Sequence, residues 1–305
     1  MPDGTLVGRL RAHPHQDHAL QAKLAEWNRA RLAPQTPQAD WRGELQREQD
    51  MLAAERQFIE TARAEQAARA AAAPREPQAF VAWFEALKEN GPGQNDALFP
   101  WLAEKATLEQ MRWFVDQEAA GEAGFDDLVA MAQVKMPAQA KLELARNFWD
   151  EMGRGNAKGM HGPMLDALVQ ALKLTPKIET TLAPSLALGN TMAALATTRA
   201  YAYHALGALG VIELTAPGRA VKVSEALRRL KVSAKARHYF DLHAVLDVKH
   251  SEAWNKEVFA SLVAERPEVA PYIAEGALMR LQCGADCFDA YRRHLWGGDG
   301  SRAPA

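Results

Sequence analysis

Three side chains between Phe240 and Trp254 have the types and the spacing of a partial metal site. His243, Asp247 and His250 follow one another at intervals of four and three residues in a segment whose pattern is helical. At about 100° per residue, these side chains fall within roughly 60° of one another on one helical face. Two imidazoles and a carboxylate so placed can bind a metal ion, although such residues are also common as solvated or hydrogen-bonded groups. Apolar residues around them indicate that the face borders the core, which favours the metal site.

A second pair of candidate ligands flanks a glycine-rich stretch. Glu151 and His161 are ten residues apart, and in one straight helix their side chains would diverge by about 80°. Gly153, Gly155 and Gly159 lie between them and allow the helix to break. We therefore expect Glu151 to end one helix and His161 to begin the next. The alternative is a surface glutamate and a loop histidine.

Glu213 is a third candidate, in a segment of small and apolar residues. The spacing predicts one long helix over 186–214, with Glu213 at its end and a short helix following over 224–230. A carboxylate in apolar surroundings is costly unless it binds a cation or is protonated. Gly207 and Gly210 precede it within this helix, which indicates close approach of another helix or of a ligand. The alternative is a helix-end glutamate in water.

Glu118, Glu122, Asp126 and Asp127 lie close together in the segment 111–128, and one of them could reach a metal ion. Glu118 and Glu122 share a helical face, whereas Asp126 and Asp127 follow a glycine. We expect the remaining carboxylates of this segment to be solvated.

The elements that must position these residues all have helical patterns. Apolar residues recur every three or four positions, proline and glycine punctuate the segments, and no segment alternates as a strand does. Residues 1–77 form a predicted helical extension rich in Ala, Gln, Glu and Arg, with two helices that pack on the main body or on a partner. The main domain is predicted over 78–296, followed by a flexible tail over 297–305. The predicted fold class is all-α.

Bulk properties exclude several classes of protein. The chain of 305 residues carries 36 basic and 38 acidic residues, a formal charge of −2 that does not favour nucleic acid or an anionic membrane as partner. No apolar run reaches the roughly 18 residues of a membrane span, and no secretory signal is recognisable. Cys283 and Cys287 are the two cysteines, expected to pack side by side on one helix. We therefore expect a cytoplasmic protein.

The chain resembles the haem-oxygenase-like di-iron oxidase and oxygenase superfamily in the order of its acidic residues and histidines: Glu151, His161, Glu213, His243, Asp247 and His250. The resemblance covers roughly residues 80 to 296 and implies a seven-helix bundle that binds two iron ions. It also implies one more carboxylate ligand on the preceding helix, where Glu118 is the best match and Glu122 the second. Four carboxylates and three imidazoles suit iron or manganese. The ferritin-type Glu-x-x-His motif does not occur in the chain.

The resemblance implies O₂-dependent oxidation of a small organic molecule. The reactions of the family include N-oxygenation of amines, desaturation, and oxidative C–C cleavage of amino acids or fatty acids. We favour N-oxygenation of an amine in a specialised-metabolite pathway, because a carboxylate from Glu118 would make the iron pair more electron-rich. Candidate polar anchors for a substrate are Arg199, Tyr201, Tyr203 and His204.

Two other expectations concern partners and an alternative class. An external electron donor is compatible with the predicted enzyme, and the N-terminal helices are expected to support a homodimer. A helical binding or scaffold protein without metal is the competing interpretation. Such a protein would have no need for seven convergent ligands, which counts against it.

Overall fold

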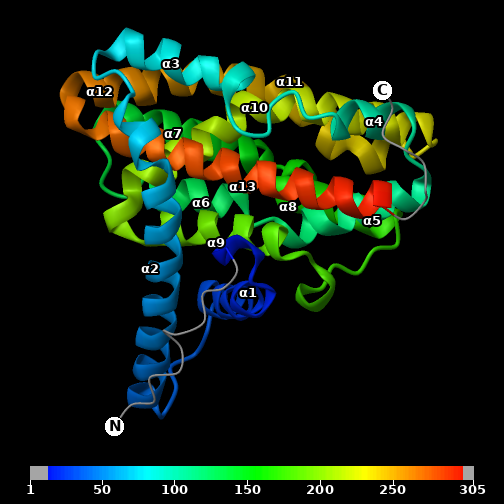
Figure 1. Ribbon diagram of the computed structural model, residues 1–305, viewed down its shortest axis with the longest axis horizontal. Helices are drawn as coiled ribbons and strands as arrows, with labels where there is room; N and C mark the ends of the chain where they lie inside the picture. Colours follow the sequence, from blue (N-terminus) through cyan, green and yellow to red (C-terminus); the bar gives the residue numbers. More distant parts are fainter. Residues whose placement is uncertain (1–12, 298–305) are drawn as a thin grey trace.

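A computed structural model describes residues 13–297 of the chain, and their regular secondary structure is helical throughout (Figure 1). The predicted all-α fold is thereby confirmed. Two helices precede the bundle, α1 (His18–Leu32) and α2 (Trp41–Ala71). The remaining helices follow in chain order: α3 (Pro77–Asn90), α4 (Leu98–Glu104), α5 (Leu108–Gly121), α6 (Phe125–Ala132), α7 (Ala138–Glu151), α8 (His161–Ala171), α9 (Ala183–Thr197), α10 (Ala202–Arg229), α11 (Ala234–Ala253), α12 (Ser261–Glu265) and α13 (Ala270–Gly297).

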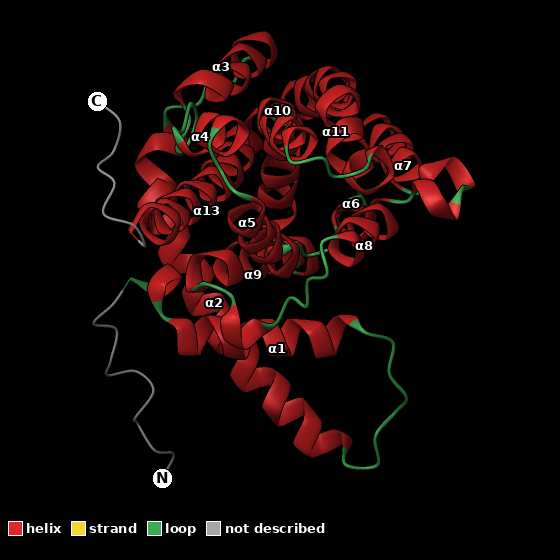
Figure 2. Cartoon of the chain, turned by 90° about the vertical axis from the view of Figure 1, so that its right-hand side faces the viewer, coloured by secondary structure: helices red, strands yellow, loops and turns green. Residues whose placement is uncertain are grey.

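Helix α10 lies between α4 and α11 and packs against both of them and against α13 (Figure 2). Two glycines bring the α10 and α13 backbones together. A Cβ atom added to Gly207 would lie 1.8 Å from the carbonyl oxygen of Ile273, and one added to Gly276 would lie 2.0 Å from that of His204. Neither position can hold a larger residue without separating the two helices. The close approach expected at Gly207 is therefore confirmed.

The prediction of one long helix over 186–214 was wrong in two respects, because the helix is interrupted within this range and continues beyond its end. The chain leaves the helical conformation at Thr198, after α9, and α10 begins at Ala202. The Thr197 hydroxyl donates to the carbonyl of Ala193, a local bond that competes with continuation of the helix. Beyond the predicted C-terminal end, α10 continues through Pro217 and includes the predicted short helix. Pro217 removes one backbone hydrogen bond, that to the carbonyl of Glu213, but burial of α10 on several sides outweighs this loss. Glu213 therefore lies inside a helix.

The N-terminal helices pack on the bundle, α1 against α9 and α2 against α13. An ionic network joins α2 to the core, because Arg63 donates to Glu275 at 2.8 Å and Glu275 also pairs with His204 at 2.6 Å. The first half of α2 extends beyond the bundle (Figure 1). It exposes Trp41 and Leu45, which are 53% and 45% accessible.

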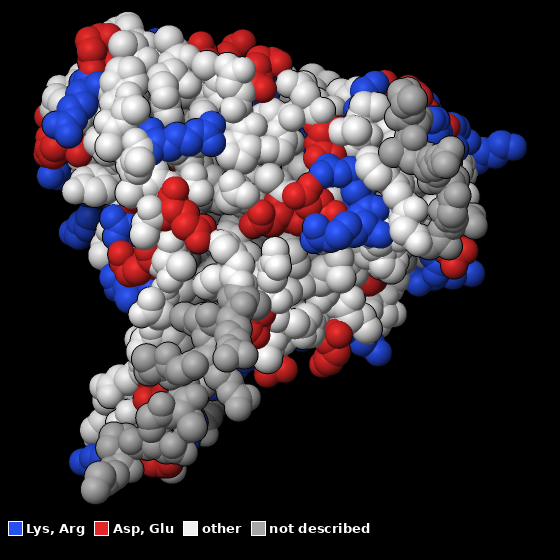
Figure 3. Space-filling view, viewed as in Figure 1, with Lys and Arg blue, Asp and Glu red and all other residues white. Residues whose placement is uncertain are grey.

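The predicted tail over 297–305 lies, apart from Gly297, outside the described residues. None of the helices within residues 13–297 has both the length and the hydropathy needed to cross a membrane. On the face shown in Figure 3, basic and acidic side chains of the described residues are interspersed over a mostly uncharged surface. Cys283 and Cys287 are buried and unbridged on α13, as expected for thiols that pack in the core.

Candidate metal centre

The glycine-rich stretch between α7 and α8 brings Glu151 and His161 together. Helix α7 ends at Glu151 and α8 begins at His161, as the sequence predicted. Gly153 and Gly155 adopt φ angles of +60° and +84°, which glycine reaches without steric cost. Met152 and Met160 form an isolated antiparallel bridge that closes the loop. The loop therefore brings the first residue of α8 next to the last residue of α7, and His161 Nδ1 lies 2.9 Å from Glu151 Oε2.

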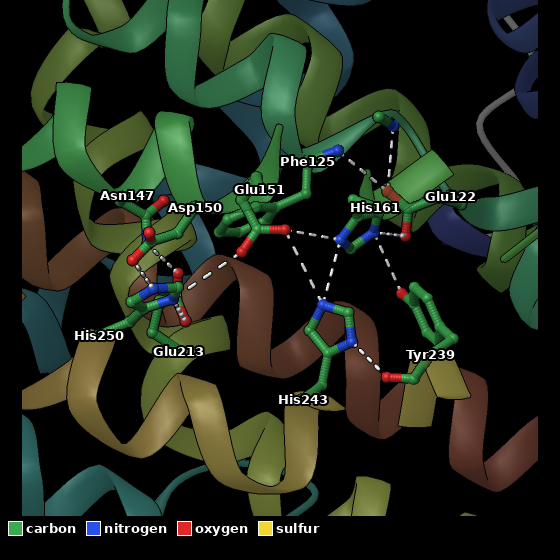
Figure 4. A network of polar contacts seen from close by, with 11 residues as sticks. Glu122, Phe125, Asn147, Asp150, Glu151, His161, Glu213, Tyr239, His243 and His250 are labelled. Carbon is green, nitrogen blue, oxygen red and sulfur yellow. Dashed lines mark hydrogen bonds and ion pairs between the residues drawn. The ribbon is translucent and has the colours of Figure 1, made fainter. Parts of the chain in front are cut away.

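A first group of closely spaced donor atoms comes from α7, α8 and α11 (Figure 4). It contains Glu151, His161 and His243, all of them buried. His243 Nε2 lies 3.2 Å from His161 Nδ1 and 3.9 Å from Glu151 Oε2. Two imidazole nitrogens and one carboxylate oxygen thus converge on one point.

A second group lies on the other side of the same carboxylate and contains Glu151, Glu213 and His250. His250 Nδ1 lies 3.4 Å from Glu213 Oε2 and 3.8 Å from Glu151 Oε1. Glu151 therefore turns one oxygen to each group (Figure 4). This is the position that a carboxylate shared between two cations would occupy.

Outer partners fix the orientation of these candidate ligands. His243 donates from Nδ1 to the backbone carbonyl of Tyr239 at 2.6 Å, which leaves its Nε2 free for the first group. His250 Nε2 lies 3.2 Å from Asp150 Oδ2, which leaves Nδ1 for the second. Asn147 donates to Glu213 Oε1 at 2.6 Å. Metal-binding histidines and carboxylates are usually held in this way.

The sequence interpretation missed Tyr239, Asp150 and Asn147. The Tyr239 hydroxyl lies 3.2 Å from His161 Nε2. Helical spacing was the only available signal for these residues, because Tyr239 precedes His243 by one turn and Asn147 precedes Glu151 by one turn. Their polar atoms are of common types and gave no further indication.

Protons balance the charges of this cluster. Burial opposes protonation, but the carboxylates of Glu122 and Glu151 raise the pKa of His161 to about 10. Burial also opposes protonation of His250, but the carboxylate of Glu213 raises the pKa of this histidine to about 9. Burial, and then the negative charge of Glu213, raises the pKa of Asp247 to about 8. Imidazolium groups and a protonated carboxyl group thus hold the metal-free cluster together, and a divalent cation could replace these protons.

The donor set fits a pair of transition-metal ions. His250 Nδ1 and Asp247 Oδ1 are buried without a hydrogen-bond partner among the described residues. Such atoms are costly in a protein interior unless something binds them. Imidazole and carboxylate donors together are typical ligands of iron and manganese.

The remaining predicted ligands lie around the two groups. Asp247 lines the same cavity as Glu151 and His243. Glu122 follows the end of α5, and its Oε2 lies 3.9 Å from His161 Nε2. Glu118 also lines the cavity, and the Tyr291 hydroxyl donates to it at 3.0 Å. Neither Glu118 nor Glu122 belongs to a donor group, but Glu122 is the one that pairs with a histidine of the cluster, which favours it as the additional carboxylate.

The donor cluster borders a cavity of about 160 Å³. The four residues considered as substrate anchors lie outside its lining and bind elsewhere: Arg199 donates to carbonyls of the α6 region, Tyr203 accepts from Arg266, Tyr201 donates to Glu60, and His204 pairs with Glu275. The charged side chains that do line the cavity beyond the cluster are Glu118, Arg219 and Arg280. The two arginines were not predicted.

An all-α bundle with a buried carboxylate–imidazole cluster defines the class of this protein. The sequence model of the family described as iron-containing redox enzymes matches residues 112–285, which is more than half of the chain, and the protein belongs to that family. No curated protein sequence matches it.

Solved structures support the fold. Two crystal structures of a CADD-like protein of unknown function from Nostoc punctiforme are similar to this chain. The first has a TM-score of 0.54 at 17% identity and covers 70% of this chain and 96% of its own. The second has a TM-score of 0.53 at 16% identity and covers 73% of this chain and 96% of its own. At these identities the likeness shows the fold alone, which is the haem-oxygenase-like bundle.

Proposed function

We propose that this protein is a non-haem di-iron enzyme that uses O₂ to oxidise a small organic molecule held in the cavity. One observation carries the proposal: Glu151 lies between two groups of donors and presents a separate oxygen to each. His161 and His243 would complete one iron site with it, and Glu213 and His250 the other. When bound, a ferrous pair would supply electrons for the reduction of O₂.

The protein's own residues would hold this centre in place and limit the access of water to it. Asn147 and Asp150 fix Glu213 and His250, so that these ligands need little rearrangement when the metal binds. Asp247 and Glu122 line the cavity beside the two groups and are the proposed additional ligands. Phe125 and Phe240 contribute apolar walls, which limit the access of water.

N-oxygenation of an amine remains the reaction we favour. The expected carboxylate ligand on the preceding helix was Glu118, and the contact with His161 favours Glu122 in that role. An additional anionic ligand would make the iron pair more electron-rich, which is the ground on which N-oxygenation is favoured. Desaturation and oxidative C–C cleavage are the alternatives, and a specialised-metabolite pathway is the proposed context.

Anaerobic loading with Fe(II), followed by metal analysis, tests the di-iron proposal. We expect two irons per chain in the native protein and loss of both in Glu151→Ala, because each group depends on that carboxylate. Glu143→Ala is the matched control, since Glu143 is buried on the same helix but pairs with Arg146 outside the cluster. A native protein that binds one iron or none, or a Glu151→Ala variant that retains both, would contradict the proposal.

Exposure of the iron-loaded protein to O₂ tests the reaction. Candidate amines and fatty acids are added separately, and the products are identified by mass spectrometry. We expect an oxygen atom on the nitrogen of an amine. A product with two hydrogen atoms fewer than the substrate would instead support desaturation, and a product with a shortened carbon chain would support oxidative C–C cleavage.

We further propose a cytoplasmic setting, an external electron donor and a homodimer. Trp41, Leu45 and Leu52 are exposed on α2 and lie within about 40° on one helical face, which would suit a second copy of the chain. Replacing all three by serine is expected to halve the mass measured by light scattering while the helix content is retained. A native protein that is already monomeric excludes the dimer.

A further inference from the structure

The cavity has a second polar region away from the donor cluster. Arg219 on α10 and Arg280 on α13 line it together with Glu118 on α5. The rings of Phe99, Phe114 and Phe288 are among the aromatic side chains that line the same cavity. Nothing in the proposed metal chemistry requires two guanidinium groups at this place.

Neither arginine has a carboxylate partner among the described residues. No ion pair within 4.0 Å involves Arg219 or Arg280 in residues 13–297. Arg280 Nε is buried and lacks any hydrogen-bond partner within the same part of the chain. Arg219 donates to the neutral hydroxyl of Thr215 at 3.1 Å. Both arginine side chains are half-buried. A partly desolvated cation without a carboxylate partner is costly, so the arrangement favours an anionic ligand.

The charges of this region leave an excess of about one positive unit. Burial raises the pKa of Glu118, although the Tyr291 hydroxyl and the two arginines oppose the shift. Burial and repulsion by Arg280 lower the pKa of Arg219 to about 10, which still leaves it charged near neutral pH. While Glu118 is ionised, two cations face one anion, and the excess is about one positive charge. A ligand with a single negative charge would then neutralise the region.

The surroundings of the arginines leave room for such a ligand. A Cβ atom added to Gly284 would lie 3.2 Å from Arg280 Nη1, so the glycine makes space for the guanidinium group. Arg219 Cζ lies 5.5 Å from the centre of the Phe288 ring. Arg219 follows Glu213 by six residues, which places it about 9 Å further along the α10 axis. A small molecule can therefore reach both the arginines and the donor cluster.

We propose that Arg219 and Arg280 bind a carboxylate of the substrate, which is therefore a carboxylic acid. Guanidinium groups bind carboxylates through paired, charge-assisted hydrogen bonds. The excess of one charge favours a carboxylate over a doubly charged phosphate. The orientation of the substrate, with its other end toward Glu151, rests on the proposed di-iron function, but carboxylate binding does not.

Calorimetric titration of the full-length protein tests the site, before and after treatment with a chelator. The probes are 3-phenylpropanoate, 2-phenylethylamine, which has a similar size but carries an amine, and phenyl phosphate. We expect 3-phenylpropanoate to bind in both preparations and more tightly than the other two. No binding of 3-phenylpropanoate, or equal or tighter binding of either other probe, would overturn the assignment.

Substitutions locate the binding. Arg219→Gln and Arg280→Gln are each expected to weaken binding of 3-phenylpropanoate by about tenfold to a hundredfold, the value of a charge-assisted hydrogen bond. Arg280→Lys keeps the charge and should retain part of the affinity, and Arg266→Gln, an exposed arginine, should change nothing. Undiminished binding in the doubly substituted protein would refute the proposal.

Iron content separates this proposal from the di-iron function. The arginine variants are expected to bind as much iron as the native protein, whereas Glu151→Ala is expected to lose iron and keep 3-phenylpropanoate. A protein that binds the acid but no iron would contradict the di-iron proposal alone. If iron binds and the acid does not, the carboxylate site alone is refuted.

Discussion

The two polar regions of the cavity satisfy their charges in opposite ways. Around Glu151, each imidazole faces a carboxylate, and the outer nitrogens of His243 and His250 face further acceptors. Around Arg219 and Arg280, within the described part of the chain, the guanidinium groups face aromatic rings and a neutral hydroxyl, and Glu118 lines the cavity without an ion pair to either. The first region can neutralise itself with protons, whereas the second has to obtain its counter-charge from a ligand.

This difference shows how one fold can prepare two kinds of binding. A cluster of acids and bases accepts a cation by releasing protons, so it is stable both with and without metal. Unpaired cations in a cavity lower the stability of the empty protein, and the ligand restores it. Removing a positively charged side chain should therefore lower the free energy of unfolding in the first region and raise it in the second.

The largest effect is expected from removing a cation of the donor cluster. In the metal-free protein, His161→Ala leaves Glu151 without its 2.9 Å partner and should lower the free energy of unfolding by about 3 to 5 kcal/mol. Urea denaturation at neutral pH measures the change. An effect below about 1 kcal/mol would show that the cluster is not held by this pair.

The second prediction concerns pH. The pKa values of about 10 for His161 and about 9 for His250 lie above the ordinary 6.5. Their stabilisation of the metal-free protein is therefore present below pH 6.5 and is lost as the pH rises through 9 and 10. Metal binding must displace these protons and that of Asp247, whose pKa is about 8, so the apparent affinity should rise with pH and about three protons should be released at pH 7. Calorimetry with Mn(II) in buffers of different ionisation enthalpy counts them, and zero release would contradict the assignment.

The third prediction tests the outer partners. Asn147→Ala removes the 2.6 Å hydrogen bond to Glu213 and should weaken metal binding by about tenfold to a hundredfold. Gln139→Ala is the control, because Gln139 lies on the same helix and bonds to Glu257 at the surface. Equal metal affinity in the two variants would remove Asn147 from the site.

The smallest expected effect is an increase, and not a decrease, in the free energy of unfolding. Arg280→Met removes an unpaired cation and should raise the free energy of unfolding by about 1 kcal/mol. Arg292→Met on the same helix breaks the ion pairs with Asp96 and Asp289 and should lower it. Chemical denaturation of both variants measures the contrast. If Arg280→Met destabilises the protein as Arg292→Met does, the two regions of the cavity do not differ as described.

Local patterns in the sequence were sufficient for much of the donor cluster. His243, Asp247 and His250 share a face because helical periodicity is set by the backbone alone. Glu151 and His161 meet because the glycines between them permit positive φ angles. Both arrangements arise within about ten residues, and neither requires knowledge of the rest of the chain.

Other features depended on contacts that are distant in the sequence. The prediction placed Glu213 at a helix end because Pro217 follows it, but burial of α10 carries the helix past the proline. The choice between Glu118 and Glu122 depended on where α5 ends, since Glu122 lies beyond Gly121 and outside the helix. Residue types alone could not decide either point.

The sequence by itself determined an all-α chain and the residue types of a carboxylate–imidazole cluster, because periodicity and short spacings act locally. The tertiary structure decided which of these groups meet, that Glu151 faces two sides, and that Arg219 and Arg280 share one cavity. Those arginines are 61 positions apart on different helices. Their proximity follows from the packing of α10 on α13 through Gly207 and Gly276, which only the folded core brings into contact.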